Sequence, residues 1–177
     1  MHAPDVEDDV PVQPLIESEA LLLCGLMWAG THHPASDEVC RVLQPGDFYD
    51  PHYGALFGVI AQQRSAGRPV DAGSLRSALT EMGDRAPLPR ASVHRVLLEV
   101  AMLRVVPELV TDYADQVLGY SYRRQFQAMA AALTHAGVSL PEEELFAALV
   151  EHGRAQRAAW ERRQTFRRRD VEKPTTM

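Results

Sequence analysis

Lysine, aromatic side chains and long apolar runs are all scarce in this sequence of 177 residues. Lysine occurs once, as Lys173 with Pro174 behind it, so the sequence contains no G-x-x-x-x-G-K-[ST] loop of the kind that holds nucleotide phosphates. No apolar run reaches the roughly 18 to 20 residues that cross a bilayer, and no charged segment followed by an apolar one opens the chain. We therefore expect a cytoplasmic protein with no membrane contact and no nucleotide-driven motor activity.

Aromatic residues make up 7% of the chain, and the other apolar residues are mostly Ala, Leu and Val. This composition favours packed helices over a sheet sandwich. Cys24 and Cys40 both lie in apolar helical patterns, where a cysteine behaves as a small apolar residue. Together with His32 and His33 they match no common zinc spacing, so core packing is the preferred interpretation and neither a metal nor a cofactor is expected.

The net charge of −6 is mild, but the charges separate along the chain. Asp5, Glu7, Asp8 and Asp9 lie close to the N-terminus, whereas arginines gather near the C-terminus. The arginine-rich end either makes weak contacts with nucleic-acid phosphates or forms the solvated face of a helix that passes into a tail. The residues considered for weak nucleic-acid contact are Arg162, Arg163, Arg167, Arg168 and Arg169.

The order of helical patterns predicts an all-α fold, with a compact helical head followed by a long antiparallel helical hairpin. Residues 1–14 hold acids and prolines and are expected to be a disordered lead. Several helices in quick succession assign residues 15–106 to the head. Two long helical patterns joined by a short turn assign residues 107–166 to the hairpin. The remaining residues, 167–177, are expected to be a disordered tail.

The aromatic stretch from Leu43 to Phe57 is predicted to be a loop that runs into a helix. Asp50 suits the N-cap of that helix, and Pro51 suits its first position. No nucleophile or carboxylate is fixed by spacing beside the histidine of this stretch, so a structural hydrogen bond is preferred to general-base catalysis, and no catalytic residue is predicted. The residues predicted to fill the core or cap helices are Phe48, Tyr49, Asp50, His52, Phe57 and Asp71.

The hairpin carries a mixed cluster of aromatic and arginine side chains. Its apolar stripe is interrupted at Arg123 and Arg124 and resumes with an offset, so one straight partner helix cannot bury it all. Aromatic residues and arginines are enriched in interface hot spots, although packing within the hairpin explains some of them equally well. The candidate surface for self-association or partner binding comprises Tyr120, Tyr122, Arg123, Arg124, Phe126 and Trp160.

Four short patterns follow one another over roughly residues 15 to 135. They are Glu17-x-Glu19-Ala20-x-Leu22-Leu23-x-Gly25, then Leu43-x-Pro45-x-Asp47-Phe48-Tyr49 with His52 and Leu56-Phe57 behind it, then Gly67-x-Pro69-Val70-Asp71-x-x-x-Leu75, and Tyr113-Ala114-x-x-Val117 with Arg123-Arg124. In this order and spacing the chain resembles the N-terminal domain of DnaB-type replicative DNA helicases. The segment over residues 84–106 departs from the family by lacking a glycine-rich turn.

The resemblance implies a helical head and a hairpin that pairs between subunits, in a collar that docks primase. Since no motor domain is recognisable, the expectation is a stand-alone, non-enzymatic module that forms a homo-dimer or higher homo-oligomer and binds primase or a full-length replicative helicase. Three roles remain open: an adaptor, a regulator that caps helicase subunits, and the remnant of a split or truncated helicase. The alternative is a small helical nucleic-acid-binding protein that uses its C-terminal arginines.

Overall fold

The computed structural model describes residues 12–171, and side chains are described from residue 15 to residue 168. Short 3-10 turns η1 (Pro45–Asp47), η2 (Gly83–Arg85) and η3 (Pro107–Leu109) lie between the α-helices. No strand occurs within residues 12–171, as the all-α prediction requires. The helices are α1 (Val12–Trp28), α2 (Pro34–Val42), α3 (Pro51–Ser65), α4 (Ala72–Met82), α5 (Arg90–Ala101), α6 (Val110–Ser139) and α7 (Glu142–Val171).

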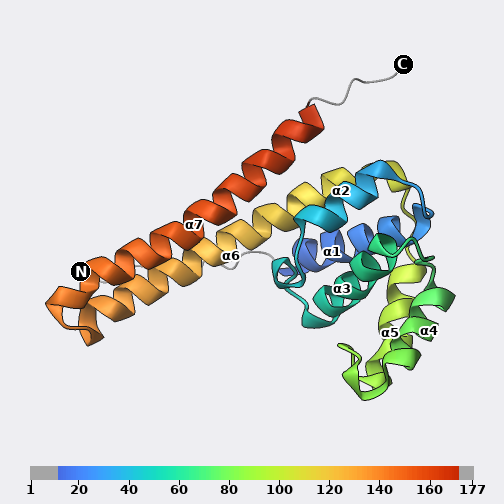
Figure 1. Cartoon of the computed structure of the whole chain (residues 1–177), viewed down its shortest axis with the longest axis horizontal. Coiled ribbons are helices and arrows are strands. Elements are labelled where there is room, and N and C mark those ends of the chain that lie inside the picture. Colours follow the sequence, from blue (N-terminus) through green and yellow to red (C-terminus); the bar gives the residue numbers. More distant parts are fainter. Residues whose placement is uncertain (1–11, 172–177) are drawn as a thin grey trace.

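The molecule consists of a compact head and a long two-helix arm (Figure 1). Helices α1 to α5 form the head together with the first turns of α6, and the rest of α6 runs out of the head. A short turn at Leu140 and Pro141 reverses the chain, and α7 returns antiparallel to α6. The predicted long antiparallel hairpin is therefore present. None of the helices within residues 12–171 is both long and apolar enough to cross a membrane.

Helices α3 and α4 of the head begin at residues whose side chains bind the free backbone N–H groups of a helix start. The carboxylate of Asp50 accepts a hydrogen bond from the backbone N–H of His52 at 2.7 Å, and the His52 ring nitrogen Nδ1 lies 3.2 Å from the same oxygen. Asp71 accepts from the backbone N–H groups of Gly73 and Ser74, at 2.9 and 3.1 Å. Both N-caps and the structural hydrogen bond of His52 thus lie where the sequence placed them.

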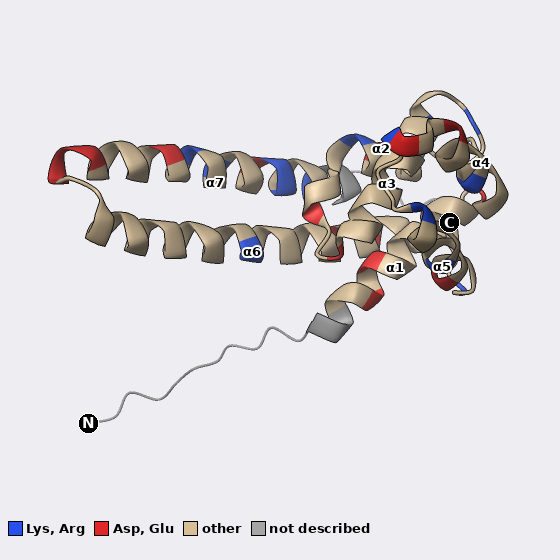
Figure 2. Cartoon of the chain, turned by 90° about the horizontal axis from the view of Figure 1, so that it is seen from below, with Lys and Arg blue, Asp and Glu red and all other residues tan. Residues whose placement is uncertain are grey.

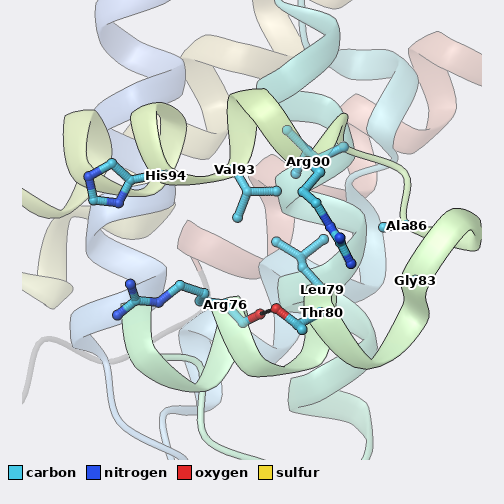
Figure 3. A pocket seen from close by; sticks show the side chains of 9 residues that line it. Arg76, Leu79, Thr80, Gly83, Ala86, Arg90, Val93 and His94 are labelled. Atoms are coloured by element: carbon cyan, nitrogen blue, oxygen red, sulfur yellow. Dashed lines mark hydrogen bonds between the residues drawn. The ribbon is translucent and has the colours of Figure 1, made fainter.

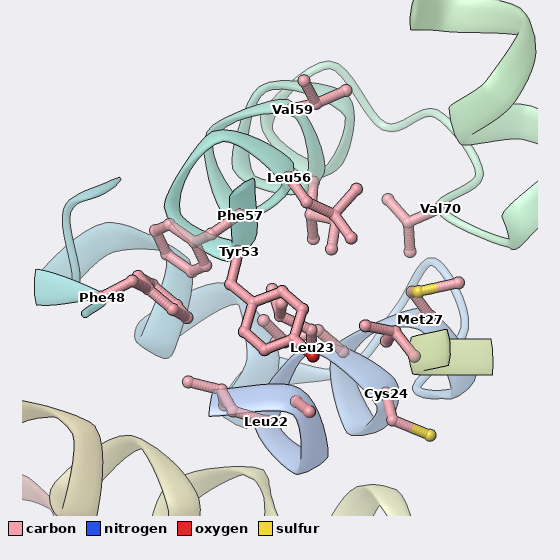
Figure 4. Packing of buried hydrophobic residues seen from close by; sticks show 14 of the residues in the cluster. Leu22, Leu23, Cys24, Met27, Phe48, Tyr53, Leu56, Phe57, Val59 and Val70 are labelled. Carbon is pink, nitrogen blue, oxygen red and sulfur yellow. The ribbon is translucent and has the colours of Figure 1, made fainter. Parts of the chain in front are cut away.

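Helix α1 lies at the centre of the head and is buried on nearly all sides (Figure 4). Leu22, Leu23 and Leu26 are completely buried, as is Cys24, whose thiol donates a hydrogen bond to the backbone oxygen of Leu103 at 3.3 Å. Cys24 is thus the packed core residue that its apolar pattern predicted.

Phe48 fixes the loop before α3 to the core. Its ring is 6% exposed and lies 5.0 Å, centroid to centroid, from the ring of Phe57, which is 1% exposed. The prediction that Tyr49 also fills the core is wrong, because its side chain is 48% exposed. The backbone is extended at Phe48, and successive side chains of an extended segment point to opposite sides, so only one of the two rings can enter the core.

The expected boundaries also change. Helix α1 begins at Val12, and α7 continues through Val171, so the expected disorder is wrong for residues 12–14 and 167–171. The burial of Phe166 against the head explains why the end of α7 remains helical. Residues 1–11 and 172–177, the remainder of the expected lead and tail, lie outside the described part of the chain.

Candidate functional site

The loop before α3 is where the head meets both helices of the hairpin. Asp47, at the end of η1, is 1% exposed, and its carboxylate accepts hydrogen bonds from the backbone N–H of Gln44 at 2.8 Å and from the hydroxyl of Ser121 in α6 at 2.7 Å. The guanidinium of Arg162 in α7 donates to the same carboxylate through both terminal nitrogens, at 2.6 and 3.1 Å. One buried carboxylate therefore joins the head to both arms of the hairpin.

Arg124 adds a second set of contacts at this junction. Its guanidinium donates to the backbone oxygen of Asp47 at 2.7 Å and lies over the Tyr49 ring, 5.8 Å from the ring centre. Beneath the loop, the carboxylate of Glu19 accepts from the backbone N–H groups of Tyr49 and Asp50, at 2.5 and 3.2 Å. Burial raises the pKa of the Glu19 carboxyl, and these two N–H groups together with the Arg124 guanidinium oppose the rise.

The end of α7 docks on the start of α6 through Asp115. Arg167 donates to both oxygens of the Asp115 carboxylate, at 2.8 and 2.9 Å, and Arg163 lies 3.6 Å from it. The hydrogen bond from Arg167 is the main cause that lowers the pKa of Asp115 below its ordinary value. Between these arginines, Phe166 inserts into the head and is 3% exposed. Ion pairs and one aromatic ring thus hold the last turns of α7 on the head.

The structure therefore divides the arginines that were considered for nucleic-acid contact. Arg162, Arg163 and Arg167 are paired with carboxylates of the same chain. Arg168 is exposed, and the side chain of Arg169 lies outside the described residues. Charge that is neutralised within the molecule attracts phosphates less.

The candidate self-association surface divides in the same way. Arg124 is used at the junction, whereas Tyr120 and Tyr122 are half-buried. Arg123 is exposed, and the rings farther along the hairpin are free, with Phe126 50% exposed and Trp160 46% exposed. The part of the surface that remains available for a partner thus lies on the arm, beyond the junction.

Sequence reasoning missed two features. The role of Asp47 at the junction is not predictable from its neighbours, since nothing local shows that Ser121 and Arg162 will reach it. The far end of the hairpin was also overlooked, although Val138 is 88% exposed and Phe146 is 75% exposed there. Phe146 follows Glu142 by four residues and Glu143 by three, so on a helix these side chains lie on the same side. Because a helix face that carries glutamates stays in water, the sequence itself indicates that Phe146 is exposed.

Among the side chains that the structure describes, no group of three His, Cys, Asp or Glu could hold a metal ion. Both cysteines are free thiols. Burial raises the pKa of the Cys40 thiol to about 12, so this group is not a nucleophile at neutral pH. His52 is engaged with the Asp50 carboxylate that caps α3.

Comparison with known proteins places this chain in a family. The model of the DnaB-like helicase N-terminal domain matches residues 12–118, which is more than half of the chain. The chain belongs to that family. Its fold is similar to the crystal structure of the N-terminal domain of DnaB helicase from Mycobacterium tuberculosis, with a TM-score of 0.59 and 20% sequence identity over 80% of this chain and 94% of that one. A comparison with curated protein sequences found no match.

The family and fold expected from the four sequence patterns are thus confirmed. The matching model is that of the helicase N-terminal domain and not of its motor domain. The match covers the head and the first turns of α6. Beyond residue 118 lies most of the hairpin, where Phe126 and Trp160 are exposed.

Proposed function

We propose that this chain is a non-enzymatic collar-like module that self-associates through its hairpin and docks a DNA-replication partner, either primase or a full-length replicative helicase. The observation that carries the proposal is the exposure of Phe126 and Trp160 on the arm, in a domain of the DnaB N-terminal family. Because the family acts in DNA replication, the proposal also places the protein in the cytoplasm.

A two-helix arm cannot bury its own apolar surface completely. Each helix has a single neighbour along the arm, so apolar side chains that do not face the seam remain in water. Large aromatic residues supply much of the binding energy at protein interfaces, and exposed apolar patches mark such sites. The rings of Phe126 and Trp160 have this character, whereas Arg124 and Arg162, nearer the head, are already bound within the chain.

Mutation of the two rings tests self-association. We expect the mass measured by size-exclusion chromatography with light scattering to show a dimer or larger species for the wild type. The double variant Phe126→Ala, Trp160→Ala should raise the dissociation constant at least about tenfold, since loss of a hot-spot aromatic side chain costs more than about 1 kcal/mol. Trp28→Ala is the matched control, because Trp28 is 63% exposed on the head, outside the hairpin.

Pull-down experiments with purified primase and replicative helicase test the docking. A wild type that stays monomeric at high concentration and retains neither partner would refute the proposal. The nucleic-acid alternative predicts instead a binding that weakens steeply with salt and disappears when residues 154–169 are removed. It has less support, because three of the five arginines are paired within the chain.

A further inference from the structure

A basic groove with an apolar floor runs between α4 and α5. It consists of two neighbouring hollows of about 270 and 130 Å³, which share Arg76 of α4 and His94 of α5. Figure 3 shows His94 above Arg76 at one end of the larger hollow and Arg90 reaching between the helices toward Leu79. The larger hollow also contacts Val93, and the smaller one contacts Leu97 and Leu98.

The charge of this groove is not neutralised by its own walls. Arg76, Arg90 and His94 are exposed, and the structure gives their side chains no acidic partner. None of the residues that line the two hollows is acidic. The contrast with Arg162 and Arg167 is clear, since those arginines bind carboxylates of the same chain. The groove therefore suits a ligand that brings carboxylates together with apolar side chains.

The tip of the hairpin carries both of these groups. Helix α7 starts with Glu142, Glu143 and Glu144, all exposed, and Figure 2 shows this acidic end far out on the arm. Phe146 is 75% exposed and Leu149 is 50% exposed, and residues three apart on a helix lie on the same side of it. No lysine or arginine occurs between Gln125 and Gly153, so the tip is acidic without a compensating charge.

We propose that the hairpin tip of one copy docks in the α4–α5 groove of a second copy. Glu143 and Glu144 would face Arg76, Arg90 and His94, while the side chains of Phe146 and Leu149 enter the two hollows. The tip and the groove lie at opposite ends of the molecule (Figure 1), so a chain cannot fill its own groove. The contact uses residues other than Phe126 and Trp160 and therefore goes beyond the hairpin pairing proposed above.

The geometry of this contact has a consequence for assembly. Since the two surfaces differ, the contact is head-to-tail, and each copy offers one free groove and one free tip after the first contact has formed. Copies then add one after another until the chain of molecules closes into a ring or continues as a filament. Hairpin pairing is instead a contact between like surfaces and ends at two copies.

Complementary variants separate the two kinds of contact. All variants carry Phe126→Ala and Trp160→Ala, so that hairpin pairing does not contribute to the mass. The groove variant adds Arg76→Glu and Arg90→Glu, and the tip variant adds Glu143→Ala and Phe146→Ala. The parent is the protein that carries Phe126→Ala and Trp160→Ala alone. In sedimentation velocity its species should increase in mass as the protein concentration rises. The groove variant and the tip variant, each measured alone, should associate at least tenfold more weakly than the parent.

The equimolar mixture of the two variants gives the decisive result. The tip variant keeps an intact groove and the groove variant keeps an intact tip, so the mixture should form a heterodimer and nothing larger. Because this heterodimer requires both proteins to be folded, it also serves as the folding control. Arg104→Glu with Arg154→Glu, which changes the charge equally at exposed positions away from the groove, should leave the parent's association unchanged.

Two results would overturn the proposal. The first is a parent that does not associate, or a mixture that remains monomeric. The second is a loss of association when Asp5, Glu7, Asp8 and Asp9 are neutralised in the parent, together with an unchanged association of the tip variant. That result would assign the groove to the acidic N-terminal segment instead. If the test of hairpin pairing fails, the sedimentation measurement is unaffected, because Phe126 and Trp160 are already replaced by alanine in every variant used here.

Discussion

At the scale of single residues, Asp47 connects the loop before α3 with both helices of the hairpin. Its buried carboxylate needs compensation, because a charge removed from water is costly unless it is paired and hydrogen-bonded. Ser121 of α6 donates a hydrogen bond to this carboxylate, and Arg162 of α7 forms an ion pair with it. The orientation of the hairpin relative to the head is therefore linked to the charge of one side chain.

We predict that Asp47→Ala lowers the free energy of unfolding by about 3 kcal/mol, as expected when the buried partner of an ion pair is removed and the other, Arg162, stays only partly exposed. Urea denaturation followed by circular dichroism measures this change. Asp84→Ala is the matched control, since Asp84 is exposed in η2 and its substitution should change the stability by less than about 0.5 kcal/mol. Equal effects of the two substitutions would show that the junction contributes little.

At the scale of elements, the close approach of η1 to α3 fixes the loop in place. A Cβ atom at Gly54 would lie 2.4 Å from the backbone oxygen of Pro45, nearer than atoms can approach, and 3.5 Å from the Cβ of Phe48. Because the nearest atom belongs to the backbone, a larger residue cannot be accommodated by rotating a side chain. The glycine thus allows the loop to lie on the helix and places Asp47 within reach of the hairpin.

Gly54→Ala should accordingly destabilise the protein by about 1 to 3 kcal/mol through overpacking. Gly153→Ala provides the opposite case, because that glycine lies in the exposed part of α7 with no atom within 4 Å of the added Cβ. There alanine should stabilise the protein by about 0.5 to 1 kcal/mol, through its higher helix propensity. Thermal melting of both variants measures the difference, and a shift of the same sign in both would contradict this account of the loop.

At the scale of the whole molecule, head and hairpin share one core. Val110, Ala114, Val117 and Leu118 of α6 are buried in the same cluster as α1 and α3. A boundary before residue 107, as the sequence suggested, separates these side chains from the head that they complete. The first turns of α6 therefore belong to the head as much as to the hairpin.

A fragment that ends at residue 106 should for this reason fail to show a cooperative melting transition, because α1 loses the apolar cover that α6 provides. A fragment that ends at residue 125 retains that cover and should melt cooperatively, at a lower temperature than the full chain, since Arg162 and Phe166 are missing. Circular dichroism melting curves compare the two. Cooperative melting of the shorter fragment would support the boundary that the sequence suggested.

Much of the fold could be predicted from the sequence, because its signals are local. The N-caps at Asp50 and Asp71 depend on groups two or three residues away, and the two long arms follow from uninterrupted helical patterns. The family was recognised from short patterns in order, and the comparisons bear this out. Such features depend on neighbours along the chain, which a sequence displays directly.

Other features were decided only by the tertiary structure. Phe48 and Tyr49 are adjacent and alike, yet one is buried and the other covers the surface beside Arg124. The five C-terminal arginines look equivalent in the sequence, but Arg162 and Arg167 find carboxylates 115 and 52 residues away. The free energy of a buried charge or ring depends on what the rest of the chain brings to it. The sequence therefore determined the helices and the family, and packing decided which side chains hold the head to the hairpin and which remain available to a partner.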